Sequence, residues 1–236
     1  MLRTTRFSDL DWATELKDIL VIGAGGIGSY TVYNLSRIGH SLNIFDYDSV
    51  DETNTIGGQL YRTKDVGKNK VSALTEIVRE FGCINEITPF NEKYTKECGS
   101  MDIVIVGPDN MEARKQAFEA WEKHLDNKAA EFQTLEECLF IDGRLLAELS
   151  EVFVIQGDKP EQIEEYKTKW LFEDSEIEEL SCTAKQTSFM AMHISSIITT
   201  LLCNWLTNNK LGMDLREIPF HTRFYSPILD FKTQIV

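Results

Sequence analysis

Residues 17–48 read KDILVIGAGGIGSYTVYNLSRIGHSLNIFDYD. Two short apolar runs enclose a glycine turn and a helix-length segment, which Gly39 closes. Apolar runs of this length predict buried strands, and glycine is the usual residue just beyond the end of a helix. We therefore expect a strand, a helix and a second, parallel strand in this order.

A second unit of the same kind follows, which favours a mostly parallel sheet with helices on both faces. The patterning near the C-terminus indicates an antiparallel extension, so the expected class is an α/β, Rossmann-like fold. A length of 236 residues with 42% hydrophobic content suits a single domain over residues 1–236. Solvent-facing helices or loops are expected over 126–138 and 158–180. The predicted helices cover 64–81, 109–124 and 187–207, and the predicted strands cover 87–90, 102–106, 139–142, 151–155, 216–220 and 228–231.

The charge balance disfavours a nucleic-acid partner. Lys and Arg number 24 against 38 Asp and Glu, and a net charge of −14 repels phosphate backbones. The five cysteines form no CxxC pair, which is typical of reduced thiols in a cytosol. Their spacing also matches no zinc-binding motif. The four histidines are scattered along the chain, so we expect core or surface roles for them.

No membrane segment is expected. The N-terminus lacks the apolar run of about 7–15 residues that marks a secretory signal, which predicts a cytoplasmic protein. The most apolar segment, residues 189–206, carries too many polar side chains for a lone membrane span and is better explained as a buried core helix. Its predicted packing stripe consists of Met190, Ile194, Ile197, Ile198, Leu201 and Trp205.

The glycine turn indicates a nucleotide site. Gly23, Gly25 and Gly28 form a GxGxxG pattern directly after a predicted strand, where glycines let a helix N-terminus approach a phosphate. Asp46 ends the next strand, 18 residues after Gly28, where it suits a ribose hydroxyl. On these features alone, NAD is the default ligand.

Three further blocks change that default. Asp48 and Asn54 follow the second strand, the segment DVGKNK ends at Lys70, and Asp109-Asn110 precedes Arg114. In this order the blocks resemble the ThiF/MoeB/HesA superfamily, adenylyltransferases related to ubiquitin-activating enzyme, in its small zinc-free branch. The resemblance is good over residues 19–115 and continues more weakly through 140–143 to Cys182.

The resemblance implies an enzyme that uses ATP and Mg²⁺ to adenylate the C-terminal carboxylate of a small ubiquitin-like or sulfur-carrier protein, or of a peptide. It also implies a homodimer. Asp46 would bind the ribose, Asn54 and Lys70 the phosphates, and Asp109 the Mg²⁺, with Arg114 supporting that centre. The implied nucleotide-binding set is Gly23, Gly25, Gly26, Gly28, Asp46, Asp48, Asn54, Gln59, Lys70 and Asn110. The implied catalytic set is Asp109, Arg114, Lys70 and Cys182.

Several of these residues have a simpler interpretation. Lys70 is also explained as a surface lysine, Asp109 as the N-cap of its helix, and Cys182 as a small buried side chain. As a functional group, Cys182 would be a thiol nucleophile near a helix N-terminus. The resemblance also breaks at Gly57-Gly58, where the family usually carries an arginine and a glutamine. Arg62, or Arg3 or Arg6 of a second copy, would then have to supply the missing phosphate clamp.

Three other functions compete with adenylation. An NAD-dependent oxidoreductase would need the glycine turn and Asp46 but has no evident use for Lys70. A nucleotide-binding scaffold without catalysis would explain the missing arginine. A tRNA-modifying dehydratase of the same superfamily is opposed by the net charge of −14.

Overall fold

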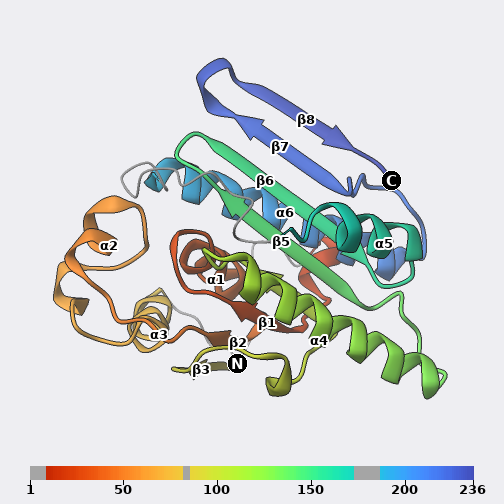
Figure 1. Ribbon diagram of the computed structural model, residues 1–236, viewed down its shortest axis with the longest axis horizontal. Coiled ribbons are helices and arrows are strands. Elements are labelled where there is room, and N and C mark those ends of the chain that lie inside the picture. The colour runs from red at the N-terminus through yellow and green to blue at the C-terminus, as the bar shows by residue number, and fades with distance from the viewer. Residues whose placement is uncertain (1–8, 82–85, 173–186) are drawn as a thin grey trace.

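The computed structural model describes residues 9–81, 86–172 and 187–236. Its strands form one sheet in the order β3-β2-β1-β4-β5-β6-β7-β8 (Figure 1). The first five strands in this order are parallel, and the last three continue the sheet in antiparallel fashion. The strands are β1 (Asp18–Ile22), β2 (Ser41–Phe45), β3 (Ile87–Phe90), β4 (Ile103–Val106), β5 (Leu139–Leu145), β6 (Leu149–Gln156), β7 (His221–Tyr225) and β8 (Asp230–Gln234).

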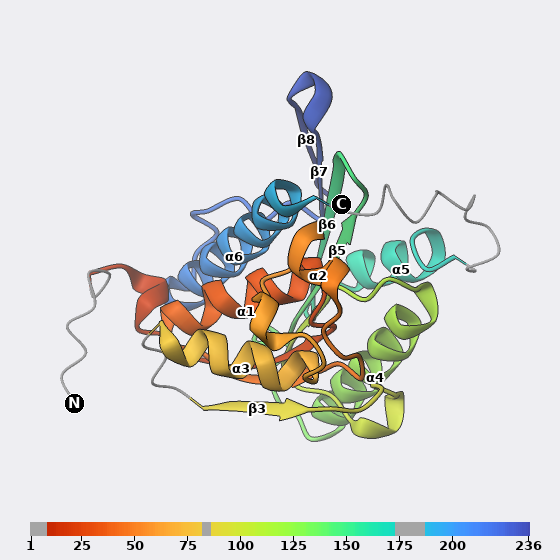
Figure 2. The same ribbon diagram turned by 90° about the vertical axis from the view of Figure 1, so that its left-hand side faces the viewer.

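Helices cover both faces of the sheet, as Figure 2 shows edge-on. One face carries α1 (Gly26–Ile38), α3 (Lys70–Glu80) and α6 (Ser188–Leu211). The other carries α4 (Met111–Ala130) and α5 (Pro160–Lys169). A short helix, α2 (Glu52–Gly57), follows β2. The Rossmann-like α/β class expected from the sequence, with its antiparallel C-terminal strands, is confirmed.

The alternation of side chains along β1 explains why this strand lies at the centre of the sheet. Ile19 and Val21 enter the core beneath α1, while Leu20 and Ile22 enter the core beneath α4. Both flanking strands pair with β1 in parallel, with Ile19 opposite Leu42 on one side and Ile103 on the other. Burial of both faces requires a continuous apolar run, which is what residues 19–22 supply.

The long apolar segment near the C-terminus is a packed core helix. By length and composition alone α6 could cross a membrane, but 56% of its most apolar window is buried inside the protein. The predicted stripe points into the core beside α1, with Ile197 only partly buried. Its buried members are Met190, Ile194, Ile198, Leu201 and Trp205.

Several predicted boundaries were wrong. The helix expected from residue 64 begins at Lys70, because residues 63–65 form a 3₁₀ turn and Gly67 takes a positive φ of 88°. The helix expected to stop at 124 continues to Ala130. The strand expected over 216–220 is displaced to β7, since Asn208 of α6 binds the backbone of residues 215 and 216 and holds them off the sheet. Ile228 belongs to a 3₁₀ turn before β8.

The glycine turn provides a test of the packing between β1 and α1. A Cβ on Gly28 would lie 1.8 Å from the carbonyl oxygen of Gly23, whereas a Cβ on Gly25 would meet nothing within 4 Å. We expect Gly28→Ala to lower the free energy of unfolding by at least about 2 kcal/mol, because a backbone atom must move. The matched variant Gly25→Ala should change it by less than about 1 kcal/mol. Urea unfolding measures both, and equal effects would contradict the packing.

Candidate nucleotide and catalytic site

The glycine turn lies against the end of β4. Gly23 has a φ of 94°, and a Cβ there would approach the carbonyl carbon of Gly107 to 3.1 Å. Gly107 in turn donates its backbone N–H to the carbonyl oxygen of Ile22 at 3.0 Å. These contacts place the first turn of α1 and the residues after β4 at one edge of the sheet. Space remains open beside Gly25, where α1 begins with no side-chain cap.

Asp46 is fixed beside this turn. One carboxylate oxygen accepts a hydrogen bond from the backbone N–H of Ala24 at 2.7 Å, and the other accepts one from the backbone N–H of Asp48 at 2.8 Å. Burial raises the pKa of Asp46, and the hydrogen bond from Ala24 acts in the opposite direction. Two backbone contacts thus hold the carboxylate rigidly where β2 ends, the position expected for a ribose-binding acid.

Lys70 is buried, so its interpretation as a surface lysine is wrong. Its ammonium donates to Asp48 Oδ2 at 2.9 Å, and its side chain is only 8% exposed. The backbone N–H of Lys70 also donates to the carbonyl oxygen of Asp48 at 2.9 Å. The start of α3 and the loop after β2 are therefore locked together, with a cation and a half-exposed carboxylate close to Asp46.

The α2 loop closes the site on the side of α1 and α6. Asn54 forms a capping box with Asp51, in which its amide oxygen accepts from the Asp51 N–H at 3.0 Å. Gly58 follows with a φ of 133°, and a Cβ there would come within 2.9 Å of the backbone nitrogen of Ser188. Next to it, Gln59 has a buried amide oxygen with no hydrogen-bond partner among the described residues.

Asp109 lies just beyond β4 with an exposed carboxylate. Asn110, and not Asp109, caps α4, because its side-chain oxygen accepts from the Ala113 N–H at 2.8 Å. The capping explanation of Asp109 is therefore wrong. One oxygen of Asp109 accepts a hydrogen bond from Asn110 Nδ2 at 3.1 Å. Asp109 follows Gly107, which lies against Gly23, so its exposed carboxylate is at the edge of the sheet that carries the glycine turn.

Arg114, in the first turns of α4, fixes the backbone next to Asp109. Its guanidinium donates to the carbonyl oxygens of Asn110 at 3.1 Å and Gly143 at 3.0 Å, and to Asp142 Oδ1 at 2.8 Å. The side chain is 8% exposed. Within this arrangement Arg114 holds the backbone around Asn110, and we assign it a positioning role.

Asp142, which the sequence did not single out as a site residue, is the centre of a buried network. Its second oxygen accepts from Arg144 at 2.7 Å and from the Tyr166 hydroxyl at 2.9 Å. Burial opposes ionisation of this carboxyl, but the charges of Arg114 and Arg144 outweigh it and hold its pKa below the usual value. Through Arg114 and Tyr166, Asp142 joins β5 to α4 and to α5.

The expected substitute for the missing arginine is not free. The Arg62 guanidinium binds Asp65 at 2.7 Å and Glu80 at 2.6 Å, which ties it to α3. Arg3, Arg6 and Cys182 lie outside the described residues, so their roles stay predictions.

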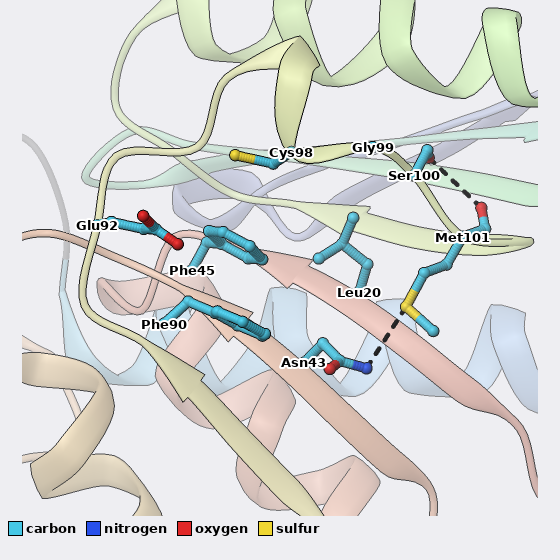
Figure 3. Close-up of a pocket in the computed structure, with 9 residues that line it drawn as sticks. All are labelled: Leu20, Asn43, Phe45, Phe90, Glu92, Cys98, Gly99, Ser100 and Met101. Atoms are coloured by element: carbon cyan, nitrogen blue, oxygen red, sulfur yellow. Dashed lines mark hydrogen bonds between the residues drawn. The ribbon is translucent and has the colours of Figure 1, made fainter.

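A hollow of about 310 Å³ opens on the α4 face of the sheet. One of its lining residues, Phe45, directly precedes Asp46 in the chain. Figure 3 shows the stacked rings of Phe45 and Phe90 within it, with Glu92 at one end and Met101 at the other. The ring centroids lie 4.4 Å apart with an interplanar angle of 8°. The remaining lining residues are Leu20, Asn43, Cys98, Gly99 and Ser100.

The buried network predicts a pH-dependent stability. The folded-state pKa of Asp142 lies below its value of about 3.9 in an unfolded chain, so its stabilisation is complete above that pH and is lost as the pH falls further. Asp142→Asn should cost about 3–5 kcal/mol at neutral pH, because two buried guanidinium groups lose their counter-charge. Urea unfolding between pH 7 and pH 3 should show a smaller acid loss in Asp142→Asn than in the wild type. The exposed Asp109→Asn serves as control, and equal stability of both variants would contradict the network.

Comparison with known proteins identifies the family. The sequence model of the ThiF family matches residues 11–227. The NEDD8-activating enzyme E1 catalytic subunit of Dictyostelium discoideum is 36% identical over 107 residues, which cover 41% of this chain and 23% of that protein. tRNA threonylcarbamoyladenosine dehydratase 2 of Saccharomyces cerevisiae is 30% identical over 110 residues, covering 43% of this chain and 25% of that protein.

Solved structures agree on the fold at low sequence identity. PaaA superposes with a TM-score of 0.70 at 15% identity, covering 96% of this chain and 66% of PaaA. MccB of E. coli, solved with ATP, gives a TM-score of 0.65 at 15% identity over 95% of this chain and 65% of MccB. The chain thus spans just under two thirds of these neighbours, and its matches span about a quarter of the curated relatives. The match of the family model over residues 11–227 shows that the chain belongs to the ThiF family.

Proposed function

We propose that this protein uses ATP to adenylate the C-terminal carboxylate of a small carrier protein or peptide. The observation that carries the proposal is the buried Lys70 ammonium, held by Asp48 beside the anchored Asp46. A buried lysine is costly unless it is paired, and a fixed cation next to a ribose-binding acid suits a triphosphate better than a dinucleotide. Membership of the ThiF family and the names of its E1-like relatives support the same activity.

The nucleotide would bind along the edge formed by the glycine turn. The open space beside Gly25 lets a phosphate approach the N-terminal N–H groups of α1, and Asp46 would accept from the ribose hydroxyls. The hollow lined by the stacked pair Phe45–Phe90, of which Phe45 precedes Asp46 in the chain, would take the flat base. Lys70 would then face the phosphates, with Asn54 and Gln59 closing the site from the α2 loop.

The reaction is attack of a carboxylate oxygen on the α-phosphorus, with departure of pyrophosphate. Negative charge builds on the leaving group while two anions approach each other, so fixed positive charge lowers the barrier. Lys70 supplies one such charge from a rigid position. Asp109 fits as a ligand for Mg²⁺, since its exposed carboxylate oxygens are the donor type that this ion prefers, and a bound Mg²⁺ would neutralise pyrophosphate charge.

The molecule that is adenylated must bring its carboxylate to this edge of the sheet, and the flexible, free C-terminus of a protein or peptide is able to do so. The names of similar proteins agree with this choice: MccB was solved with MccA, and two relatives are named as a NEDD8-activating and a SUMO-activating enzyme. Because Arg62 is bound to Asp65 and Glu80, we also propose a homodimer in which Arg6 of a second copy completes the phosphate clamp. We propose the cytoplasm as its location.

ATP–pyrophosphate exchange tests the function. We expect exchange that requires a small protein or peptide with a free C-terminal carboxylate, screened from candidates encoded nearby. Lys70→Met should lower the exchange rate about a hundredfold, because a preorganised contact to the phosphates is lost. The matched variant Lys68→Met, whose ammonium pairs with Glu76 on the surface, should stay within a few-fold of wild type.

Melting temperatures with ATP and Mg²⁺, or with NAD, separate the competing functions. A ligand at a hundred times its dissociation constant adds about 2.7 kcal/mol of stability, which is readily measured. Stabilisation by ATP without exchange would indicate a scaffold that has lost catalysis. A larger stabilisation by NAD than by ATP, or equal exchange losses in Lys70→Met and Lys68→Met, would overturn the proposal.

A further inference from the structure

Three side chains with metal-binding atoms gather at the edge of the sheet opposite the nucleotide site. Asp102 directly precedes β4 and Cys138 directly precedes β5, so the pairing of these strands brings them together, with the Leu139 N–H donating to the Asp102 carbonyl oxygen at 2.8 Å. His124 reaches the same place from α4. Asp109, at the far end of β4, belongs to the nucleotide edge.

The three side chains already point their ligand atoms at one another. His124 Nε2 lies 2.7 Å from Asp102 Oδ1, and Cys138 Sγ lies 3.6 Å from the same oxygen. All three ligand atoms fall within 4.8 Å of each other. Solvent reaches the site in part, because the side chains of Asp102 and His124 are 40% and 27% exposed while Cys138 is fully buried.

The positions of these atoms are set by packing. Trp121, buried in the core beneath α4, donates its indole N–H to the Asp102 carbonyl oxygen at 3.3 Å, one turn before His124. On the next turn Lys128 donates to Asp102 Oδ1 at 2.7 Å. The helix and both strands therefore hold a carboxylate, an imidazole and a thiol in fixed relation, an arrangement that costs little to organise around an ion.

We propose that Asp102, His124 and Cys138 form a binding site for a divalent transition metal of the zinc type. One oxygen, one nitrogen and one sulfur ligand match the mixed donor set that Zn²⁺ accepts, and a water from solvent completes four-coordination. Mg²⁺ and Ca²⁺ are excluded as occupants, because they prefer oxygen ligands. None of the three residues belongs to a CxxC pair.

Metal binding rearranges the protons and charges of the cluster. Burial raises the pKa of the Cys138 thiol to about 12, so in the metal-free protein it is neutral; on binding it forms a sulfur–metal bond and releases its proton to solvent. The Lys128 ammonium lies on Asp102 Oδ1, the oxygen that His124 also contacts, so a metal bound to this oxygen displaces it. The carboxylate of Glu137, which pairs with Lys17 at 3.6 Å, is near enough to attract it. Lys128 thus competes with the metal for Asp102.

This competition separates a metal site from a purely structural one. If the cluster only ties α4 to the sheet through ion pairs, replacing Lys128 weakens the protein and has no effect on metal. If it binds a metal, Lys128→Met frees Asp102 and tightens binding at least about tenfold, the scale on which neighbours of metal ligands act.

Titration with Co²⁺ provides the test, because a cobalt–thiolate bond gives a charge-transfer band in the near ultraviolet that Zn²⁺ then removes by displacement. We expect one Co²⁺ per chain with this band in the wild type. His124→Gln, at a partly exposed position, should keep the fold and lose at least about tenfold in affinity, and Cys138→Ser should lose the band. Cys98→Ser, which removes an exposed thiol outside the cluster, should retain it.

The proposal is overturned by a wild type without the band, by a band that disappears in Cys98→Ser and persists in Cys138→Ser, or by a Lys128→Met variant that folds but binds Co²⁺ no more tightly. Circular dichroism on each variant establishes folding. Should Cys138→Ser fail to fold, the wild type and His124→Gln still decide the outcome: a band in the wild type with unchanged Co²⁺ affinity in His124→Gln also overturns the proposal.

Discussion

The close approach of Gly28 to the carbonyl oxygen of Gly23 is the contact on which the nucleotide edge depends. Without a side chain at Gly28, α1 packs onto the turn after β1, and its free N-terminal N–H groups face the open space beside Gly25. The same turn presents the Ala24 N–H to Asp46, which fixes the end of β2. One backbone packing contact therefore sets both the helix N-terminus and the carboxylate to which the proposed function assigns the phosphates and the ribose.

A second constraint holds the opposite side of the site. At Asp142 a single buried carboxylate joins β5 to Arg114 of α4 and to Tyr166 of α5. Since Arg114 also binds the carbonyl oxygen of Asn110, the loop that carries Asp109 cannot move independently of this network. Binding groups that are rigid before the substrate arrives lose little entropy when it binds, which is the physical basis of an efficient phosphoryl site.

The sequence predicted the features that depend on local pattern. The apolar runs and the glycine turn led to the β1-α1-β2 unit, and Asp46 follows β2 as the pattern predicted. The binding roles of Asp46 and Lys70 stay predictions. The role of Asp142 was missed because it lies within an apolar strand, 28 residues from Arg114, and only the fold brings them together. Asp102, His124 and Cys138 were missed for the same reason, since separations of 22 and 14 residues match no metal-binding motif. The displaced strand β7 depended on side-chain contacts from Asn208, which no local pattern encodes.

In the proposed reaction the chemistry occurs at the α-phosphorus, between Lys70 and Asp109 and above the glycine turn. This location predicts the fate of the carboxylate oxygen. A carrier peptide labelled with ¹⁸O in its C-terminal carboxylate should pass one labelled oxygen to AMP. That oxygen bonds to the α-phosphorus as pyrophosphate leaves, and it stays on AMP when water attacks the acyl carbon and breaks the acyl carbon–oxygen bond. Mass spectrometry of the released nucleotide makes the measurement. Label in AMP is the predicted result, whereas label in inorganic phosphate or pyrophosphate, with none in AMP, would contradict adenylation.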